Sequence, residues 1–349
     1  MATTFKTLNS ANDVTSTRTL LHEAIPLTGT IASGTYTDNN IKTYSHGMFE
    51  SVYDYPYLSS SANHIFDVTT GYASNSSLSG SGVQNSKKLN IYSQMAQVLV
   101  GYDATGSIQS FDRDGDIALG GDKINEAIFV NFSRLLTKDE MKKGSFVASF
   151  LTGGTPAART DLMTIADHGA AASYKVNSPA GEYGILYTSS ATPNADSGVG
   201  LVYYQAGVAV LTGSIFGGID GTPADKSSMG PGFASGTYDS LATGSTIQVL
   251  ADSFRNRIHN ISFNNTVELN STVYFCRASH NEFNYSTNPT YLSESQIRVK
   301  NSTTDNPVSY VTTVGLYSSD NELLAVAKLS EPLKKDPSTE VTLRVRLDF

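Results

Sequence analysis

The stretch that decides the fold is VTLRVRLDF, at residues 341–349. Apolar residues occupy every second position in it, and polar residues fill the positions between them. Successive side chains of a strand point to opposite faces of a sheet, so this period of two predicts a half-buried strand. Upstream, SYVTTVGLY (309–317) and ELLAVAKL (322–329) flank SSDN (318–321) and predict a hairpin. We therefore expect the C-terminal residues to lie inside an antiparallel sheet.

Length and composition favour a mainly β protein with more than one core. At 349 residues the chain exceeds the usual size of one domain, roughly 100–200 residues. Charged residues make up 16%, below the roughly 25% of average globular proteins, whereas Ser, Thr, Asn, Gly and Tyr are abundant. These residue types are typical of turns and strands.

The charge pattern and the lack of long apolar runs argue against two classes of partner. With 24 basic and 32 acidic residues the net charge is −8, so the sequence offers no dense Lys/Arg surface for nucleic acid. No apolar run approaches the ~18 residues of a membrane span, and the N-terminus lacks the pattern of a secretory signal. We expect neither nucleic acid nor a membrane as partner, and synthesis in a reducing cytoplasm.

Helical periodicity is confined to a few places. The stretches that predict helices are 86–100, 137–143 and a third that begins near Ser245. Gly101 stands where a glycine ends the first helix. The pair Thr137 and Glu140 forms a capping box for the second, which Gly144 would end. The third helix places five apolar residues on one face: Ile247, Leu250, Ala251, Phe254 and Ile258.

Strand patterns fill the middle of the chain. They cover 127–132, 145–150, 182–187 and 200–211, and Gly207 in the last predicts a bulge or break. We expect a mainly β fold with a few helices, built from β-sandwich-type α+β domains. The expected segments are an extended arm with short strands (1–84), a β-rich domain with two helices (85–212), a Gly/Ser/Pro-rich loop (213–244), and a helix followed by an antiparallel β-domain (245–349).

The alternating carboxylates of 112–116 suggest a calcium-binding loop as one hypothesis. An EF-hand loop that began at Asp112 would need Gly at its sixth position and Glu at its twelfth, and these are Ile117 and Lys123. A solvated turn explains the stretch better, and a weak cation site at Asp112 to Asp116 stays open.

Other catalytic and cofactor motifs are incomplete. The six histidines are scattered, and the single cysteine, Cys276, falls in an expected strand, where a small buried side chain is the simplest interpretation. The stretches 79–82 and 221–227 lack the spacing of a nucleophile elbow and of a phosphate loop. A carboxylate pair for glycoside hydrolysis carries no signature that a sequence would reveal. We expect no catalytic residue, no metal, no cofactor and no enzymatic activity.

Several long stretches carry a resemblance to a known family, namely 91–103, 130–140, 254–277, 281–291 and 321–333. They resemble virion structural proteins of large contractile-tailed bacteriophages, of the kind found in cyanophage-like myoviruses. Together they extend over the chain from about residue 60 to its end. The resemblance implies a structural protein of the tail or baseplate, or of the neck or collar, made in the host bacterial cytoplasm. Its expected partners are other virion proteins and copies of itself, in a homo-oligomer.

One loop is a candidate docking site for such a neighbour. In the stretch 282–289, Asn288 and Pro289 favour a turn, and Phe283 and Tyr285 offer aromatic anchors. The competing interpretation is a loop whose aromatic rings cover its own core.

A second aromatic cluster, Tyr53, Tyr55 and Tyr57, favours an alternative function. Exposed tyrosines stack on sugars, so the chain could instead be a peripheral receptor- or glycan-binding module, such as a fibre or adhesin. Local packing of this Pro-Tyr segment is the simpler interpretation. A depolymerising enzyme ranks third, because it would normally show sequence repeats, and none is visible.

Overall fold

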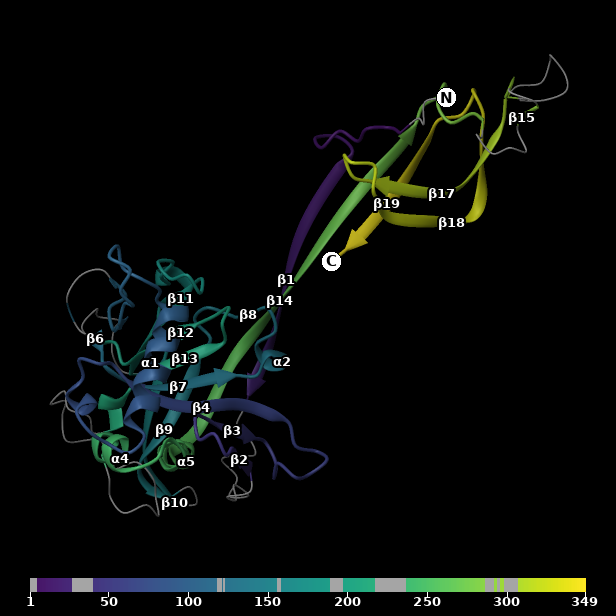
Figure 1. Ribbon diagram of the computed structural model, residues 1–349. Helices are drawn as coiled ribbons and strands as arrows, with labels where there is room; N and C mark the ends of the chain where they lie inside the picture. The colour runs from purple at the N-terminus through teal and green to yellow at the C-terminus, as the bar shows by residue number, and fades with distance from the viewer. Residues whose placement is uncertain are drawn as a thin grey trace. The chain divides into compact units, whose positions relative to one another are not determined.

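The computed structural model describes residues 5–26, 40–117, 121, 123–155, 158–188, 197–216, 237–285, 292–293, 296–297 and 307–349 (Figure 1). These residues form a mainly β fold with a few helices, which confirms the fold class expected from the sequence. The chain divides into two compact units. The terminal unit comprises Met1–Leu20 and Glu268–Phe349, and the central unit comprises Leu21–Val267. Strands β1 (Val14–Pro26) and β14 (Ile258–Ala278) contribute residues to both units.

The central unit is built on one long antiparallel sheet. Its strand order is β14-β9-β10-β11-β12-β13-β7-β4-β3-β2, with β8 paired to β14. The bounds of these strands are β2 Ile41–Thr43, β3 Glu50–Tyr53, β4 His64–Tyr72, β7 Glu126–Phe132, β8 Glu140–Met141, β9 Val147–Thr155, β10 Ala158–Ala166, β11 Tyr183–Thr188, β12 Gly200–Tyr203 and β13 Val208–Thr212. A separate two-stranded sheet joins β5 (Phe111–Asp112) and β6 (Lys123–Ile124). The helices are α1 Asn85–Leu99, α2 Arg134–Thr137, α3 Ala170–Ser173, α4 Tyr238–Gly244 and α5 Ile247–Arg257, with 3-10 turns at Ser77–Ser79 and Gly213–Phe216.

Both faces of this sheet carry buried apolar side chains, because different elements pack on each face. Along β7, Ile128 and Val130 belong to one hydrophobic cluster and Phe129 between them belongs to another. The first cluster includes Phe132 of β7 and Phe263 of β14, whose ring centroids lie 5.4 Å apart. The β14 end of the sheet therefore packs over one face of β7, in a sandwich-like arrangement. Helix α1 packs in the second cluster, over the opposite face.

Helix α1 follows the predicted stretch 86–100 closely, and Gly101 after it has a φ of +90°. The helix lies against β4 at Gly71, where a Cβ atom would come within 2.6 Å of the Lys88 carbonyl oxygen. Only a residue without a side chain permits this approach.

Helix α5 also matches its prediction, with Thr246 as its N-cap rather than Ser245. The Thr246 hydroxyl accepts a hydrogen bond from the Val249 backbone N–H at 3.4 Å. The predicted helical face is buried at Leu250, Ala251 and Phe254.

The helix predicted over 137–143 is wrong. Helix α2 already ends at Thr137, Lys138 has a φ of +53°, and Glu140–Met141 forms strand β8. Met141 is fully buried and pairs with Asn265 of β14. The burial and pairing of this strand outweigh a local capping pattern, which contributes only about 1 kcal/mol.

The division into units differs from the four expected segments. Strands β3 and β4 lie within the expected arm 1–84, yet they pair with the sheet and bury Val52 and Phe66 completely. Most of the expected loop 213–244 lies outside the described residues. Its two ends, Gly213–Phe216 and Tyr238–Gly244, form the second 3-10 turn and α4. The long strand predicted over 200–211 is a hairpin of β12 and β13, with Gly207 at a φ of +69° in its turn.

The terminal unit contains the β-structure predicted for the C-terminal residues. Strand β19 (Val341–Asp348) pairs with β14 from Ser271↔Asp348 to Ala278↔Val341. Strands β17 (Ser309–Tyr317) and β18 (Leu323–Lys335) form the predicted hairpin, and β18 continues further than expected. The short strands β15 (Leu292–Ser293) and β16 (Gln296–Ile297) pair with each other. None of the described helices has the length and apolar character needed to cross a bilayer.

Candidate assembly surface

The terminal unit leaves nearly all of its apolar side chains accessible to solvent. Among the described residues, Val345 is its only buried apolar side chain, and the other buried apolar residues belong to the central unit. Its large exposed apolar residues are Phe5, Leu20, Leu269, Phe283, Tyr285, Tyr310, Tyr317, Leu323, Leu324, Val326, Leu333 and Phe349. Burial of apolar surface is the dominant favourable contribution to folding, so these strands still have apolar area to bury against a partner.

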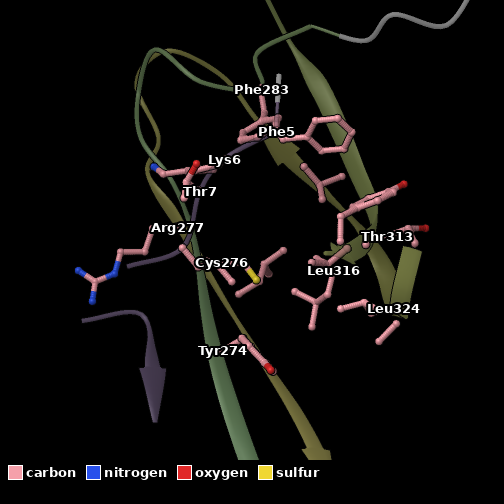
Figure 2. Close-up of a pocket in the computed structure, with 18 of the residues that line it drawn as sticks. Phe5, Lys6, Thr7, Tyr274, Cys276, Arg277, Phe283, Thr313, Leu316 and Leu324 are labelled. Carbon is pink, nitrogen blue, oxygen red and sulfur yellow. The ribbon is translucent and has the colours of Figure 1, made fainter. Parts of the chain in front are cut away.

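A large open cavity lies within this unit, with a volume of about 820 Å³ (Figure 2). Side chains of β14, β17, β18 and β19 line it, together with the N-terminal residues 5–8. On β14, Tyr274 and Cys276 lie on the side that faces Leu316 and Leu324, and Arg277 also lines the cavity, with its guanidinium group directed outward (Figure 2). The hairpin and the β14–β19 sheet thus approach each other without filling the space between them.

The N-terminal residues close one side of the cavity. The ring of Phe5 lies edge-on to that of Tyr317, with centroids 4.9 Å apart and an interplanar angle of 62°. Next to it, the Lys6 ammonium pairs with the Glu282 carboxylate, and this hydrogen bond holds the pKa of Glu282 below its ordinary value. The N-terminal segment and the loop after β14 therefore order each other.

Cys276 lies in a strand, as the sequence predicts, but its side chain is only partly buried and lines the cavity. Burial, helped by the negative charge of Asp13, raises the pKa of the Cys276 thiol. The thiolate is the reactive form of cysteine, so a raised pKa makes this side chain a weak nucleophile. Its contribution here is apolar surface.

The loop that follows β14 is held by a buried lysine. The Lys335 ammonium, with no exposed surface, donates to the Asn284 side-chain oxygen at 2.7 Å and to the Asp336 carbonyl oxygen at 3.0 Å. The Asn284 amide in turn donates to the His280 carbonyl oxygen at 2.6 Å. The position of Asn284 is therefore fixed between two residues that are themselves exposed.

Those two residues are the aromatic anchors expected from the sequence. Phe283 is 41% exposed and Tyr285 is 48% exposed, and Phe283 also lies at the rim of the cavity. Phe283 has a φ of +54°, an unfavourable conformation for a non-glycine residue. Asn288 and Pro289 lie outside the described residues.

The second predicted aromatic cluster belongs to the central unit, in the turn between β3 and β4. Tyr53 is partly buried, and its ring lies 6.4 Å from that of Tyr57. Tyr55 and Tyr57 are 47% and 37% exposed. The Asp54 carboxylate shapes the turn by accepting hydrogen bonds from the Asn63 backbone and side chain. Local packing and partial exposure therefore coexist in this cluster.

The carboxylates of Asp112, Asp114 and Asp116 lie within 4.8 Å of one another. They do not form a solvated turn, because Asp112 is buried and its carboxylate pairs with the Lys123 ammonium. Asp112 also accepts backbone hydrogen bonds from Asp114 and Gly115. An ammonium group already neutralises the innermost of the three carboxylates.

Buried ionisable groups in the central unit are the polar residues that sequence reasoning missed. Lys88 is fully buried on α1, and desolvation lowers the pKa of its ammonium to about 8. Burial likewise raises the pKa of Glu50 to about 7 and that of Asp167 to about 6. Lys88 and Asp167 bind backbone groups of other elements, which is a structural role. The sequence gives no signal that distinguishes such residues from exposed ones.

The terminal unit therefore presents apolar strands and aromatic rings that a partner protein could bind. Comparison with protein-family models, characterised proteins and solved structures gave no match to this chain.

Proposed function

We propose that the chain is a non-enzymatic structural component of a bacteriophage virion. Its location would be the tail or baseplate of a contractile tail, or the neck or collar region. There it would hold other virion proteins and copies of itself through its β-domains. The virion assignment is supported by the sequence resemblance, and the assembly role is supported by the terminal unit.

The observation that carries the proposal is the contrast between the two units. The central unit buries both faces of its sheet, whereas the terminal unit buries one apolar side chain among its described residues. Stable protein interfaces resemble interiors, with apolar surface excluded from water at their centre. A unit that keeps its strands and rings accessible is suited to complete its core with neighbouring subunits.

The experiment that tests the proposal is cryo-electron microscopy of intact particles of the phage that encodes the chain. We expect density for the chain at the tail, baseplate or neck, with the apolar strands of the terminal unit covered by other subunits. If mass spectrometry of purified particles does not detect the chain, the proposal is overturned.

The second candidate function is a receptor- or glycan-binding module at the virion periphery. It is favoured by the exposed rings of Tyr55 and Tyr57, which lie in one turn of the central unit. A glycan array probed with the isolated chain separates the two functions. Binding that is lost in Tyr55→Ala and Tyr57→Ala variants would favour host recognition, and the absence of binding would favour the structural role.

A further inference from the structure

We infer that strand β17 pairs edge to edge, in antiparallel orientation, with β17 of a second copy of this chain. The inference deepens the proposed structural role and rests on it. It joins two β17–β18 hairpins into a four-stranded sheet across a two-fold axis.

The first observation is that β17 has an unprotected edge. Among the described residues, β17 and β18 pair only with each other, so each has an outer edge without a partner strand. Native proteins protect such edges with charges, prolines or short strands. Strand β17 is nine residues long and has neither a charged residue nor a proline.

The other candidate edges of this unit carry that protection. Strand β18 contains Lys328, Glu331, Pro332 and Lys334, and proline cannot donate a hydrogen bond to a neighbouring strand. Strand β19 contains two arginines, Arg344 and Arg346. Among the hairpin strands and β19, as far as the described residues show, only β17 therefore lacks a charged residue or a proline.

The second observation concerns the faces of the hairpin. A Cβ atom on Gly315 would lie 2.9 Å from the Tyr317 ring and 3.2 Å from Leu323. Val326, which is directly opposite Gly315, projects from the same face. Tyr317, Leu323 and Val326 are 46%, 53% and 53% exposed. An apolar face therefore accompanies the unprotected edge.

The exposed apolar side chains of the hairpin would add to the backbone pairing in a dimer. The hairpin exposes Tyr310, Tyr317, Leu323, Leu324, Val326 and Leu333. Exposed by about half, two aromatic and four aliphatic side chains offer roughly 300–500 Å². A standard interface buries roughly 800 Å² per partner, and somewhat more than half of it is apolar.

Charge complementarity favours a second copy as the occupant. Two-fold pairing of a strand with itself brings each position near the axis close to its own symmetry mate. A charged residue there would meet a like charge, so a strand without charges near its centre is suited to pair with itself in this way. The neutrality of β17 meets this condition, while the chain as a whole carries a net charge of −8.

The test adds one carboxylate to β17 while it preserves the hairpin. Thr313 is exposed and lies opposite Lys328, so Thr313→Glu gains a cross-strand ion pair within its own chain. The matched control is Thr342→Glu on β19, where the exposed Thr342 lies opposite Arg277. Both variants introduce the same residue opposite a cation.

We expect the full-length protein to be dimeric in size-exclusion chromatography with light scattering. Thr313→Glu should weaken the dimer by roughly a hundredfold in Kd, and Thr342→Glu should leave it unchanged. Hydrogen exchange provides a second readout. The outward amides of β17 should lose protection in Thr313→Glu, whereas the amides shared with β18 should keep it.

A protein that is monomeric at all accessible concentrations would overturn the inference, as would equal weakening by both variants. A ring or trimer in which the outer amides of β17 exchange freely would overturn it too. These failures are distinct from failure of the proposed function. If particles contain the chain but its β17 strands are not paired, only the inferred interface is wrong. If particles lack the chain, the proposed virion role is wrong.

Discussion

The ammonium of Lys88 donates a hydrogen bond of 2.6 Å to the carbonyl oxygen of Ala242, far away in the sequence. The same nitrogen donates to the carbonyl oxygens of Val83 at 2.8 Å and Ser245 at 2.7 Å. All three protons of a fully buried ammonium are thus used, and α1 is tied to the turn between α4 and α5.

Replacement of Lys88 should therefore weaken the central unit. We expect Lys88→Met to lower the free energy of unfolding by about 2–3 kcal/mol, because one buried and two partly buried carbonyl groups lose a charged donor. The matched control is Lys87→Met on the same helix, since Lys87 is exposed and bonds to the His46 carbonyl oxygen at the surface. That change should alter stability by about 0.5 kcal/mol or less. Urea titrations of both variants check the difference, and equal losses would contradict it.

Glu50 should make the stability of the protein depend on pH. Its side chain is buried, and Thr43 and Gln248 only partly offset the desolvation of its carboxylate. Desolvation, with a smaller contribution from the Asp252 charge, raises the pKa of Glu50 from 4.5 to about 7. Between these values the folded protein binds more protons than the unfolded chain, so stability falls as pH rises from about 4.5 to about 7.

The variant Glu50→Gln removes this loss. We expect it to match the wild type near the lower end of this range, and to be more stable by about 2–3 kcal/mol at pH 8. Exposed Glu23 serves as control, because the Lys138 ammonium lowers the pKa of that carboxyl. Glu23→Gln should not reproduce the gain. Thermal unfolding across the pH range tests the prediction, and a pH-independent difference for Glu50→Gln would rule it out.

Asp167 and Tyr204 should be energetically coupled. The Asp167 carboxylate accepts hydrogen bonds from the Tyr204 hydroxyl at 2.9 Å and from the backbone N–H groups of Gly144 at 2.7 Å and Phe146 at 3.0 Å. We expect Tyr204→Phe alone to lower the free energy of unfolding by about 1.5–3 kcal/mol. In a protein that already carries Asp167→Asn, the same change should cost at least about 1 kcal/mol less.

The neighbouring Tyr203 provides the control for this cycle. Its buried hydroxyl has no hydrogen-bond partner among the residues that the structure describes, so Tyr203→Phe should be neutral or slightly stabilising. A double-mutant cycle by urea unfolding measures the coupling. Additive effects of the Asp167 and Tyr204 changes would show that the hydrogen bond contributes nothing specific.

Gly71 should tolerate no side chain. In Gly71→Ala the new methyl group would meet the Lys88 carbonyl oxygen at 2.6 Å and the Tyr92 amide nitrogen at 2.8 Å, and neither backbone atom can rotate away. We expect a loss of about 1–3 kcal/mol as α1 is pushed from β4. Gly80→Ala is the control, because no atom of the described residues lies within 4 Å of its Cβ position and its φ is −69°. Differential scanning calorimetry should show a lowered Tm for the first variant alone.

Local sequence patterns were sufficient where a single periodicity dominated. The alternation in 341–349 predicts β19, and its residues alternate in burial along the strand. The helical spacing around Leu250 and Phe254 predicts α5, whose apolar face is buried. Each pattern works because it reflects the geometry of one element, whatever that element packs against.

Local patterns failed where a distant partner decided the outcome. The capping box at Thr137 and Glu140 predicts a helix, but pairing with β14 makes Glu140–Met141 a strand. Strands β3 and β4 resemble an arm in sequence, and only the completed sheet buries them.

The candidate assembly surface shows the same division between sequence and structure. Alternation by itself determines that the terminal strands have an apolar face, and the aromatic character of Phe283 and Tyr285 is equally visible in the sequence. Only the tertiary structure decides that this face stays exposed, since exposure depends on what packs against each strand. For the same reason the sequence does not predict the burial of Lys88 and Lys335. A lysine is buried only when distant carbonyl or amide oxygens come together around its ammonium.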